Sequence, residues 1–189
     1  AGQEKFHGAV ISHSGREDTR VFRECTQLGK ELQSLGDSFL EGCTPAKAGI
    51  LFDWNNWWAL ELASGPSKDM DYLKTVSLYY ETLYRQNIPV DILPYDAEVS
   101  GYDLIVAPML YMTKEGVAEH LKDFVRDGGT LVTTVMSGLA DETDRCIFGA
   151  YPGKLKDLLG IWVEETDALR PYEKNRMKLS DKLALAKAE

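Results

Sequence analysis

The spacing of apolar residues alternates along this chain between a helical repeat and short unbroken runs. From about Glu17 to Leu35 apolar residues recur every three or four positions, which places them on one face of a helix that ends at Gly36. The segments 48–53, up to its final Asp53, and 104–107 are apolar without alternation. Such runs predict strands that are buried on both faces of a sheet.

A tryptophan-rich stretch and a second helix follow the first of these strands. Residues 54–58 hold three of the four tryptophans and are predicted to form a loop. Ser67 is predicted to cap a helix that reaches about Gln86. The stripe expected to be buried on this helix consists of Met70, Leu73, Ser77, Tyr80 and Tyr84.

The second half of the chain continues this order of strands and helices. Strands are predicted over 90–93 and 130–135, a short helix over 155–159 and an edge strand over 161–163. Thr113 is predicted to cap a longer helix, whose apolar face is formed by Val117, Leu121, Phe124 and Val125. Strands that alternate with helices at this spacing predict right-handed crossovers. We therefore expect an α/β fold, a three-layer sandwich with a mainly parallel sheet of the flavodoxin-like or class I glutamine amidotransferase-like type.

Composition and charge exclude several classes of function. The 189 residues carry a net charge of -9, and their Lys and Arg residues are scattered, so no nucleic-acid partner is expected. No apolar run approaches 18 residues, so no membrane partner is expected either. Cys25, Cys43 and Cys146 fit neither a disulfide framework nor a zinc site, and they predict free thiols in a reducing cytoplasm. Cys25 lies on the apolar helix face, where we expect it to pack in a core.

The ends of the strands are the places where an open parallel sheet usually binds its ligand. Bulky tryptophans after Asp53 would keep a phosphate away from the backbone, so no nucleotide or flavin cofactor is expected. After the third strand, amidotransferases place a nucleophilic Cys, but this chain has Met109, whose thioether is not a nucleophile. His120 shares a helix face with apolar residues and is interpreted as a residue at the border of the core.

Two other candidates for chemistry lie after the fourth strand. Ser137 lacks the Gly-x-Ser-x-Gly elbow of hydrolases and is interpreted as a residue that forms a turn. Asp141, Glu142 and Asp144 do not have the spacing of a cation-binding loop, so we expect no metal and a solvated acidic loop.

The tryptophans Trp54, Trp57 and Trp58 have three possible roles. Aromatic side chains are favoured in protein interfaces, they fill cores, and they stack on sugar rings. We take an interface as the leading hypothesis and expect at least one of the three to be buried.

Three blocks of the sequence resemble the β-galactosidases of glycoside hydrolase family 42. The first runs from Glu4-Lys5-Phe6-His7-Gly8 through residue 24, and the second covers 48–60. The third covers 129–164 and includes Ser137-Gly138 and Tyr151-Pro152-Gly153. The resemblance implies that residues 1–46 are the end of a catalytic barrel, its last helix and a linker. It also implies that 47–170 are a trimerisation domain. The polar tail 171–189 does not align with the family and is interpreted from its composition as a linker or arm towards a C-terminal domain.

The resemblance further implies where the chemistry of such a protein lies. Glu4, Lys5, Phe6 and His7 match the family motif that binds the galactosyl ring, so they are candidate substrate-binding residues of a longer parent enzyme. The family cleaves terminal β-D-galactose residues with retention, using two glutamates of earlier barrel strands, and neither is in this chain. We therefore expect no catalytic residue here, no cofactor, a homotrimeric parent and an inactive fragment. The alternative is a stand-alone amidotransferase-like hydrolase with Cys146 or Ser137 as nucleophile.

Overall fold

The computed structural model describes residues 9–12, 14–40, 42–63, 65–149, 151–170 and 172–176. The chain divides into two compact units, Ala1–Thr44 and Pro45–Glu189. In the described part of the chain no helix is long and apolar enough to cross a membrane.

The first unit consists mainly of helix α1, Arg20–Leu35, and the short 3-10 helix η2, Gly36–Phe39. The hydroxyl of Thr19 accepts a hydrogen bond from the Phe22 N–H, so α1 begins three residues later than the apolar spacing predicted. Gly36 ends it with a φ of 55°. Cys25 is exposed on this helix, and the expectation that it packs in a core is wrong for the described residues.

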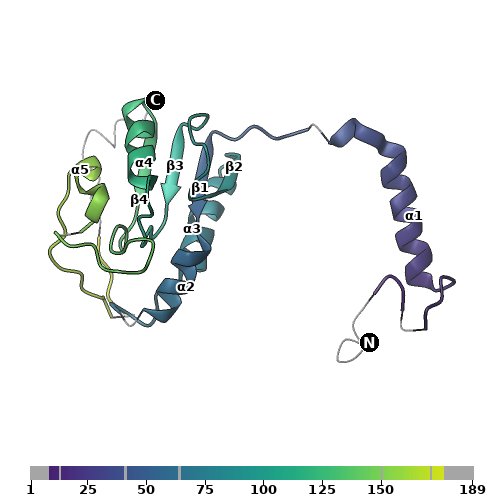
Figure 1. Cartoon of the computed structure of the whole chain (residues 1–189), viewed down its shortest axis with the longest axis horizontal. Coiled ribbons are helices and arrows are strands. Elements are labelled where there is room, and N and C mark those ends of the chain that lie inside the picture. The colour runs from purple at the N-terminus through teal and green to yellow at the C-terminus, as the bar shows by residue number, and fades with distance from the viewer. Residues whose placement is uncertain are drawn as a thin grey trace. The chain divides into compact units, whose positions relative to one another are not determined.

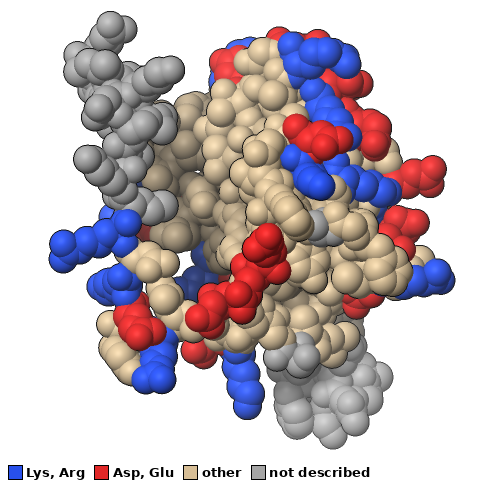
Figure 2. Space-filling model, turned by 90° about the vertical axis from the view of Figure 1, so that its left-hand side faces the viewer, with Lys and Arg blue, Asp and Glu red and all other residues tan. Residues whose placement is uncertain are grey.

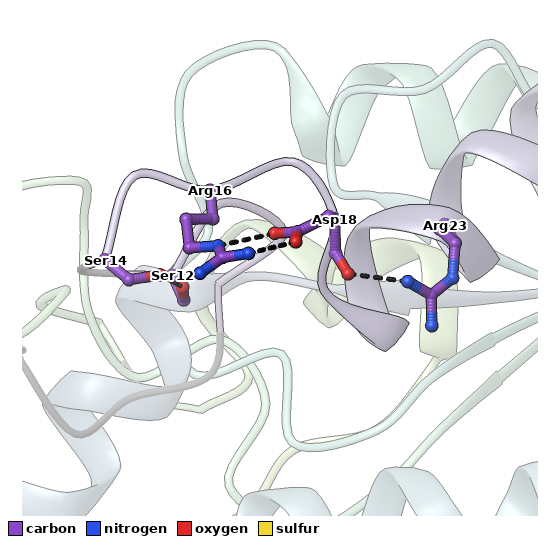
Figure 3. Close-up of polar contacts among 5 residues, drawn as sticks. All are labelled: Ser12, Ser14, Arg16, Asp18 and Arg23. Carbon is purple, nitrogen blue, oxygen red and sulfur yellow. Dashed lines mark hydrogen bonds and ion pairs between the residues drawn. The ribbon is translucent and has the colours of Figure 1, made fainter.

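A small polar network holds the chain ahead of α1 (Figure 3). Arg16 Nε donates to Asp18 Oδ1 at 2.7 Å, and Arg23 Nη1 donates to the Asp18 carbonyl oxygen at 2.6 Å. The hydrogen bonds from the Arg16 guanidinium lower the pKa of the Asp18 carboxyl. This pairing ties the segment before the helix to its first turn.

The second unit is built on a four-stranded sheet in the order β2-β1-β3-β4 (Figure 1). The strands are β1 (Ala48–Phe52), β2 (Val90–Pro94), β3 (Leu104–Ala107) and β4 (Thr130–Thr133). All neighbouring pairs are parallel. The helices are α2 (Trp54–Leu62), α3 (Tyr72–Tyr84), α4 (Val117–Arg126) and α5 (Lys156–Leu159), with the 3-10 helix η3 (Gly153–Leu155) ahead of α5.

Alternate residues of the central strands point to opposite faces of the sheet and build two cores. On one face Ile50 and Val106 pack with side chains of α2 and α3, including Leu60 and Val76. On the other face Leu51 and Ile105 belong to a core with residues of α4 and with Leu155. The arrangement of helices on both faces of a parallel sheet confirms the predicted three-layer α/β fold.

Helix α3 buries a different face from the predicted one. Tyr72 and Val76 are buried and Tyr79 and Leu83 are partly buried, whereas the predicted stripe includes the exposed residues Leu73, Tyr80 and Tyr84. The two faces are offset by one residue and are similarly apolar, so the spacing did not distinguish them. The helix also starts later than predicted, because Asp71, not Ser67, accepts a hydrogen bond from the Lys74 N–H at 2.9 Å.

Helix α4 buries Val117, Leu121 and Phe124, with Val125 packed against the same core, as predicted. Thr113 does not cap it. The side chain of Thr113 is fully buried, and the helix begins after Gly116, whose φ is 79°. A threonine four residues ahead of the first helical residue is too far away to accept from its N–H groups.

The far end of α4 is closed by two glycines with different roles. The N–H of Gly128 donates to the Val125 carbonyl and that of Gly129 to the Phe124 carbonyl, which forms a Schellman motif. Gly128 has a φ of 102°. At Gly129 the Phe124 ring lies where a Cβ atom would be, within 2.3 Å. Gly128 thus allows the left-handed backbone conformation, and Gly129 leaves space for the Phe124 ring.

The chain after β4 forms turns rather than a fifth strand. A single antiparallel bridge joins Val163 to Tyr151, so the edge strand predicted over 161–163 is not formed in the described residues. The short helix α5 ends at Gly160 with a φ of 62°, as predicted.

Candidate functional site

The carboxyl edge of the sheet carries a buried ion pair. Asp53 follows β1 and caps α2, because its Oδ1 accepts from the Asn55 N–H at 3.1 Å. The same oxygen accepts from Lys114 Nζ at 2.9 Å, and both side chains are almost fully buried. Lys114 Nζ also lies 3.7 Å from the centre of the Tyr95 ring, just after β2. The pair therefore ties together the ends of two strands and the turn that follows β3.

Two further polar side chains extend this network, in which Asp53 Oδ2 and Asn56 Nδ2 are buried without a hydrogen-bond partner among the described residues. Asn56 Oδ1 accepts from the Met112 N–H at 2.7 Å, and the Tyr72 hydroxyl accepts from the Asp53 N–H at 3.0 Å. Burial raises the pKa of Tyr72 to about 12. These side chains bond to backbone groups and to one another inside the protein, so we interpret the network as structural.

The turn after β3 lacks a nucleophile. Met109 is buried in the core with Ile50 and Val106, and its φ is 43°. Its N–H donates to Thr134 Oγ1 at 2.7 Å. The strained position where an amidotransferase-like enzyme would place a cysteine is thus occupied by a thioether that packs in the core.

The candidate nucleophiles of the alternative hydrolase have structural or isolated positions. Ser137 Oγ accepts from the Leu110 N–H at 3.1 Å and donates to the Thr134 carbonyl at 2.9 Å, as expected for a residue that forms a turn. Cys146 is exposed. His120 lies on α4 and is 3.9 Å from the Glu98 carboxylate, and in the described part of the chain no hydrogen bond joins it to Ser137 or Cys146. The geometry therefore gives no support to that alternative.

The acidic loop is held by its own side chains. Asp141 Oδ1 accepts from the Thr143 N–H at 2.8 Å, from Thr143 Oγ1 at 2.7 Å and from the Arg145 N–H at 3.1 Å. These hydrogen bonds, the one from Thr143 above all, lower the pKa of the Asp141 carboxyl. Within the described ranges no three residues of metal-binding type are grouped closely enough to hold an ion.

The three tryptophans lie on helix α2 and not in a loop. Asp53 caps α2, so the helix begins at Trp54, directly after β1. The sequence contains this capping signal, but the bulky aromatic residues that follow it favoured the interpretation as a loop. Trp54 and Trp58 are one turn apart and about half exposed, at 56% and 55%. Trp57 packs against the core beside Phe52, and its Nε1 donates to Glu61 at 2.8 Å. The side chains still form one aromatic cluster, with 5.3 Å between the ring centres of Trp54 and Trp57 and 6.1 Å between those of Trp54 and Trp58.

The remaining candidates divide into residues that lie outside the described part and residues that the sequence did not single out. Glu4, Lys5, Phe6 and His7 lie outside the described residues. Lys114 was missed because nothing in the local pattern predicts a buried lysine. Phe148 and Trp162 were also not identified as candidates. Phe148 could have been, because a large apolar residue beside Gly149 in a polar loop indicates an exposed aromatic side chain.

Comparison with known proteins relates most of the chain to one group. Residues 46–188 match the model of the β-galactosidase trimerisation domain, and residues 1–35 match the β-galactosidase model of glycoside hydrolase family 42. The chain is 51% identical over 174 residues to the β-galactosidase BgaP of Planococcus sp. strain L4, which covers 92% of this chain and 26% of that protein. It is 47% identical over 181 residues to the β-galactosidase LacZ of Lactobacillus acidophilus, which covers 96% and 27%.

Solved structures give the same relationship. The β-galactosidase from Bacillus circulans sp. alkalophilus superposes with a TM-score of 0.76 at 50% identity, over 92% of this chain and 26% of that one. The enzyme from Rahnella sp. R3 gives a TM-score of 0.69 at 44% identity, over 89% and 25%. The chain therefore spans about a quarter of the length of the relatives that it matches.

Proposed function

Because the chain belongs to the family 42 β-galactosidases, of which it carries the trimerisation domain and the end of the catalytic domain, we propose that it is the assembly module of a longer β-galactosidase. The observation that carries this proposal is the match of residues 46–188 to the trimerisation domain. The structure supports it, since a buried ion pair and core side chains fill the carboxyl edge of the sheet in this α/β domain.

The proposed activity of the full-length protein is the hydrolysis of terminal non-reducing β-D-galactose residues. Retaining glycosidases use one carboxylic acid to protonate the leaving oxygen and a second carboxylate as nucleophile. Neither glutamate is expected in this chain, so we propose that the chain contributes to catalysis through assembly. Glu4, Lys5, Phe6 and His7 would bind the galactosyl ring once the rest of the barrel is present.

We propose a first domain boundary at residues 46 and 47. The division of the structure after Thr44 and the ends of the two family matches, at 35 and 46, support it. The match that continues to residue 188 favours counting 171–188 with the trimerisation domain rather than with a separate linker or arm. The three exposed, free cysteines support our proposal that the protein works in a reducing cytoplasm.

The interface candidates on α2 are Trp54 and Trp58. Both are more than half exposed and share one side of the helix, whereas Trp57 is partly buried. Rigid aromatic side chains are enriched at the centre of protein interfaces. We propose that Trp54 and Trp58 contact another subunit and that Trp57 supports the helix from below.

Assembly is tested on the full-length enzyme that contains this chain. Light scattering combined with size-exclusion chromatography should give the mass of three subunits. A monomeric enzyme at micromolar concentration would contradict the assembly role.

Activity is tested with a chromogenic β-galactoside, on the 189-residue chain beside the full-length enzyme. The chain should give the background rate, because it has no acid and nucleophile pair. Turnover by the purified chain that persists after Glu4→Gln would show that the chemistry lies elsewhere.

A further inference from the structure

The segment after β4 carries an aromatic surface that the proposed function does not use. Phe148 is 97% exposed and Trp162 is 63% exposed, and both border the same groove of about 370 Å³. Its lining also includes Cys146, Tyr151 and Val163. We call this the Phe148 surface, defined by these five residues.

An ordered backbone holds the Phe148 surface in place. An antiparallel bridge pairs Cys146 with Ala140, and the Ile147 N–H donates to the Leu139 carbonyl at 2.9 Å. On the other side of the groove the Val163 N–H donates to the Tyr151 carbonyl at 3.0 Å. The exposed aromatic rings therefore rest on a scaffold that is already formed, which lowers the conformational entropy lost when a partner binds.

The chemistry of the groove favours a protein partner. Among the described residues of its lining, Glu164 is the only charged one, so a nucleic acid or an anionic lipid surface would find no basic cluster there. The side of the molecule that includes α5 shows a broad uncharged area, with a row of acidic side chains across its lower part and acidic and basic side chains together at its upper border (Figure 2). Lys156 Nζ lies 5.7 Å from the centre of the Trp162 ring, a cation at the border of the aromatic surface. Aromatic residues beside a charged rim are typical of protein interfaces.

We propose that the Phe148 surface packs against a second copy of the full-length protein in the trimer. This inference rests on the proposed function and names a surface for it. The surface lies inside the range 46–188 that matches the trimerisation domain. A ring of three copies joins two different surfaces of each subunit, because only a two-fold axis can pair a surface with itself. Trp54 and Trp58 on α2 provide one aromatic surface, and the Phe148 surface provides the other.

The first experiment replaces the aromatic side chains in the full-length protein. Phe148→Gln and Trp162→Gln should each raise the concentration at which the trimer dissociates by about 30-fold or more. Leu78→Gln on α3 is the matched control, since Leu78 is a large apolar residue that is 60% exposed and lies outside the surface. It should leave dissociation unchanged. In the 189-residue chain Phe148→Gln should not shift thermal unfolding, because so little of this side chain is buried.

The second experiment needs no substitution that could impair folding. Cys146 lies in the groove and is exposed in this chain. Alkylation of Cys146 by iodoacetamide, followed by peptide mass spectrometry, should be at least about tenfold slower in the full-length trimer than in the 189-residue chain. Dissociation by dilution should restore the faster rate.

The outcomes separate this inference from the proposed function. If the wild-type enzyme is a trimer, dissociation that is unchanged in both aromatic variants or equal alkylation rates would overturn the inference and leave the assembly role intact. A monomeric wild-type enzyme would overturn both.

Discussion

Single residues at the carboxyl edge of the sheet connect several elements at once. Asp53 ends β1, caps α2 and pairs with Lys114, and its own N–H donates to the Tyr72 hydroxyl of α3. Because both members of the ion pair are nearly fully buried, the cost of removing one charge is mainly the burial of the other without a partner.

Lys114→Met should therefore lower the free energy of unfolding by about 3 to 5 kcal/mol. The double variant Asp53→Asn with Lys114→Met keeps a capping oxygen and removes the unpaired charge. Its free energy of unfolding should therefore fall by less than that of Lys114→Met alone. Urea unfolding of the 189-residue chain measures both. A loss below about 1 kcal/mol in Lys114→Met would show that other groups stabilise the buried Asp53 charge when Lys114 is absent.

Tyr72 gives a prediction for alkaline pH. Its folded pKa of about 12 lies above the ordinary value of about 10, so the folded state favours the neutral phenol. The stabilising contribution is complete below pH 10 and is lost as the pH rises from about 10 to about 12. Between pH 9 and 11.5 the free energy of unfolding of the wild type should fall by about 2 kcal/mol more than that of Tyr72→Phe, in which position 72 cannot titrate. Parallel pH dependence of the two proteins in urea unfolding would contradict the buried environment of Tyr72.

At the scale of elements, the end of α4 allows two effects to be measured separately. One is the strain of a left-handed backbone, and the other is the clash of an added side chain with its neighbour. Gly128 has a positive φ with no atom within 4 Å of a Cβ position, whereas Gly129 lies against the Phe124 ring. The two glycines are adjacent and close the same helix, so their alanine variants form a matched pair.

Gly128→Ala should destabilise the chain by about 1 kcal/mol through the left-handed backbone alone. Gly129→Ala should cost about 1 to 3 kcal/mol, because Phe124 must move out of a core position. Combining Gly129→Ala with Phe124→Leu should cost less than the sum of the two single changes, since the clash is removed. Additive losses in thermal unfolding would show that the ring adjusts without strain.

At the scale of the whole molecule, one side of α2 contributes to the folding of its own domain, and the other side is available for contact with another subunit. Trp57 faces the core of its own domain and Trp54 and Trp58 face outward. Folding and assembly should therefore respond to different tryptophans.

Trp57→Ala should lower the stability of the 189-residue chain by about 3 kcal/mol, near the low end for a buried tryptophan because Trp57 is only partly buried. Trp58→Ala should change that stability little and should weaken the trimer of the full-length enzyme by about 2 kcal/mol or more. Thermal unfolding of the chain and dilution of the trimer measure the two effects. A trimer that withstands Trp58→Ala while the chain loses stability would place Trp58 in the core and reject its interface role.

The sequence by itself determined the fold class and the order of β1 to β4 with α3, α4 and α5, but it missed α2 and predicted a fifth strand over 161–163 that is not formed in the described residues. The unbroken apolar runs of β1 and β3 and the single apolar face of α4 have no equally good alternative, so their spacing was sufficient. The blocks around Glu4 and over 129–164 also identified the family, because they combine turn residues and charges in an order that a generic α/β domain does not need.

Only the tertiary structure decided which faces are buried and which polar groups meet. The two candidate faces of α3 are similarly apolar, so the choice between them depended on the fit of Tyr72 and Val76 against Ile50 and Val106. Asp53 and Lys114 are 61 residues apart, and their pairing follows from the order of the strands rather than from local spacing. Local sequence sets periodicity and caps, whereas burial and long-range pairing depend on what the rest of the chain brings to the same place.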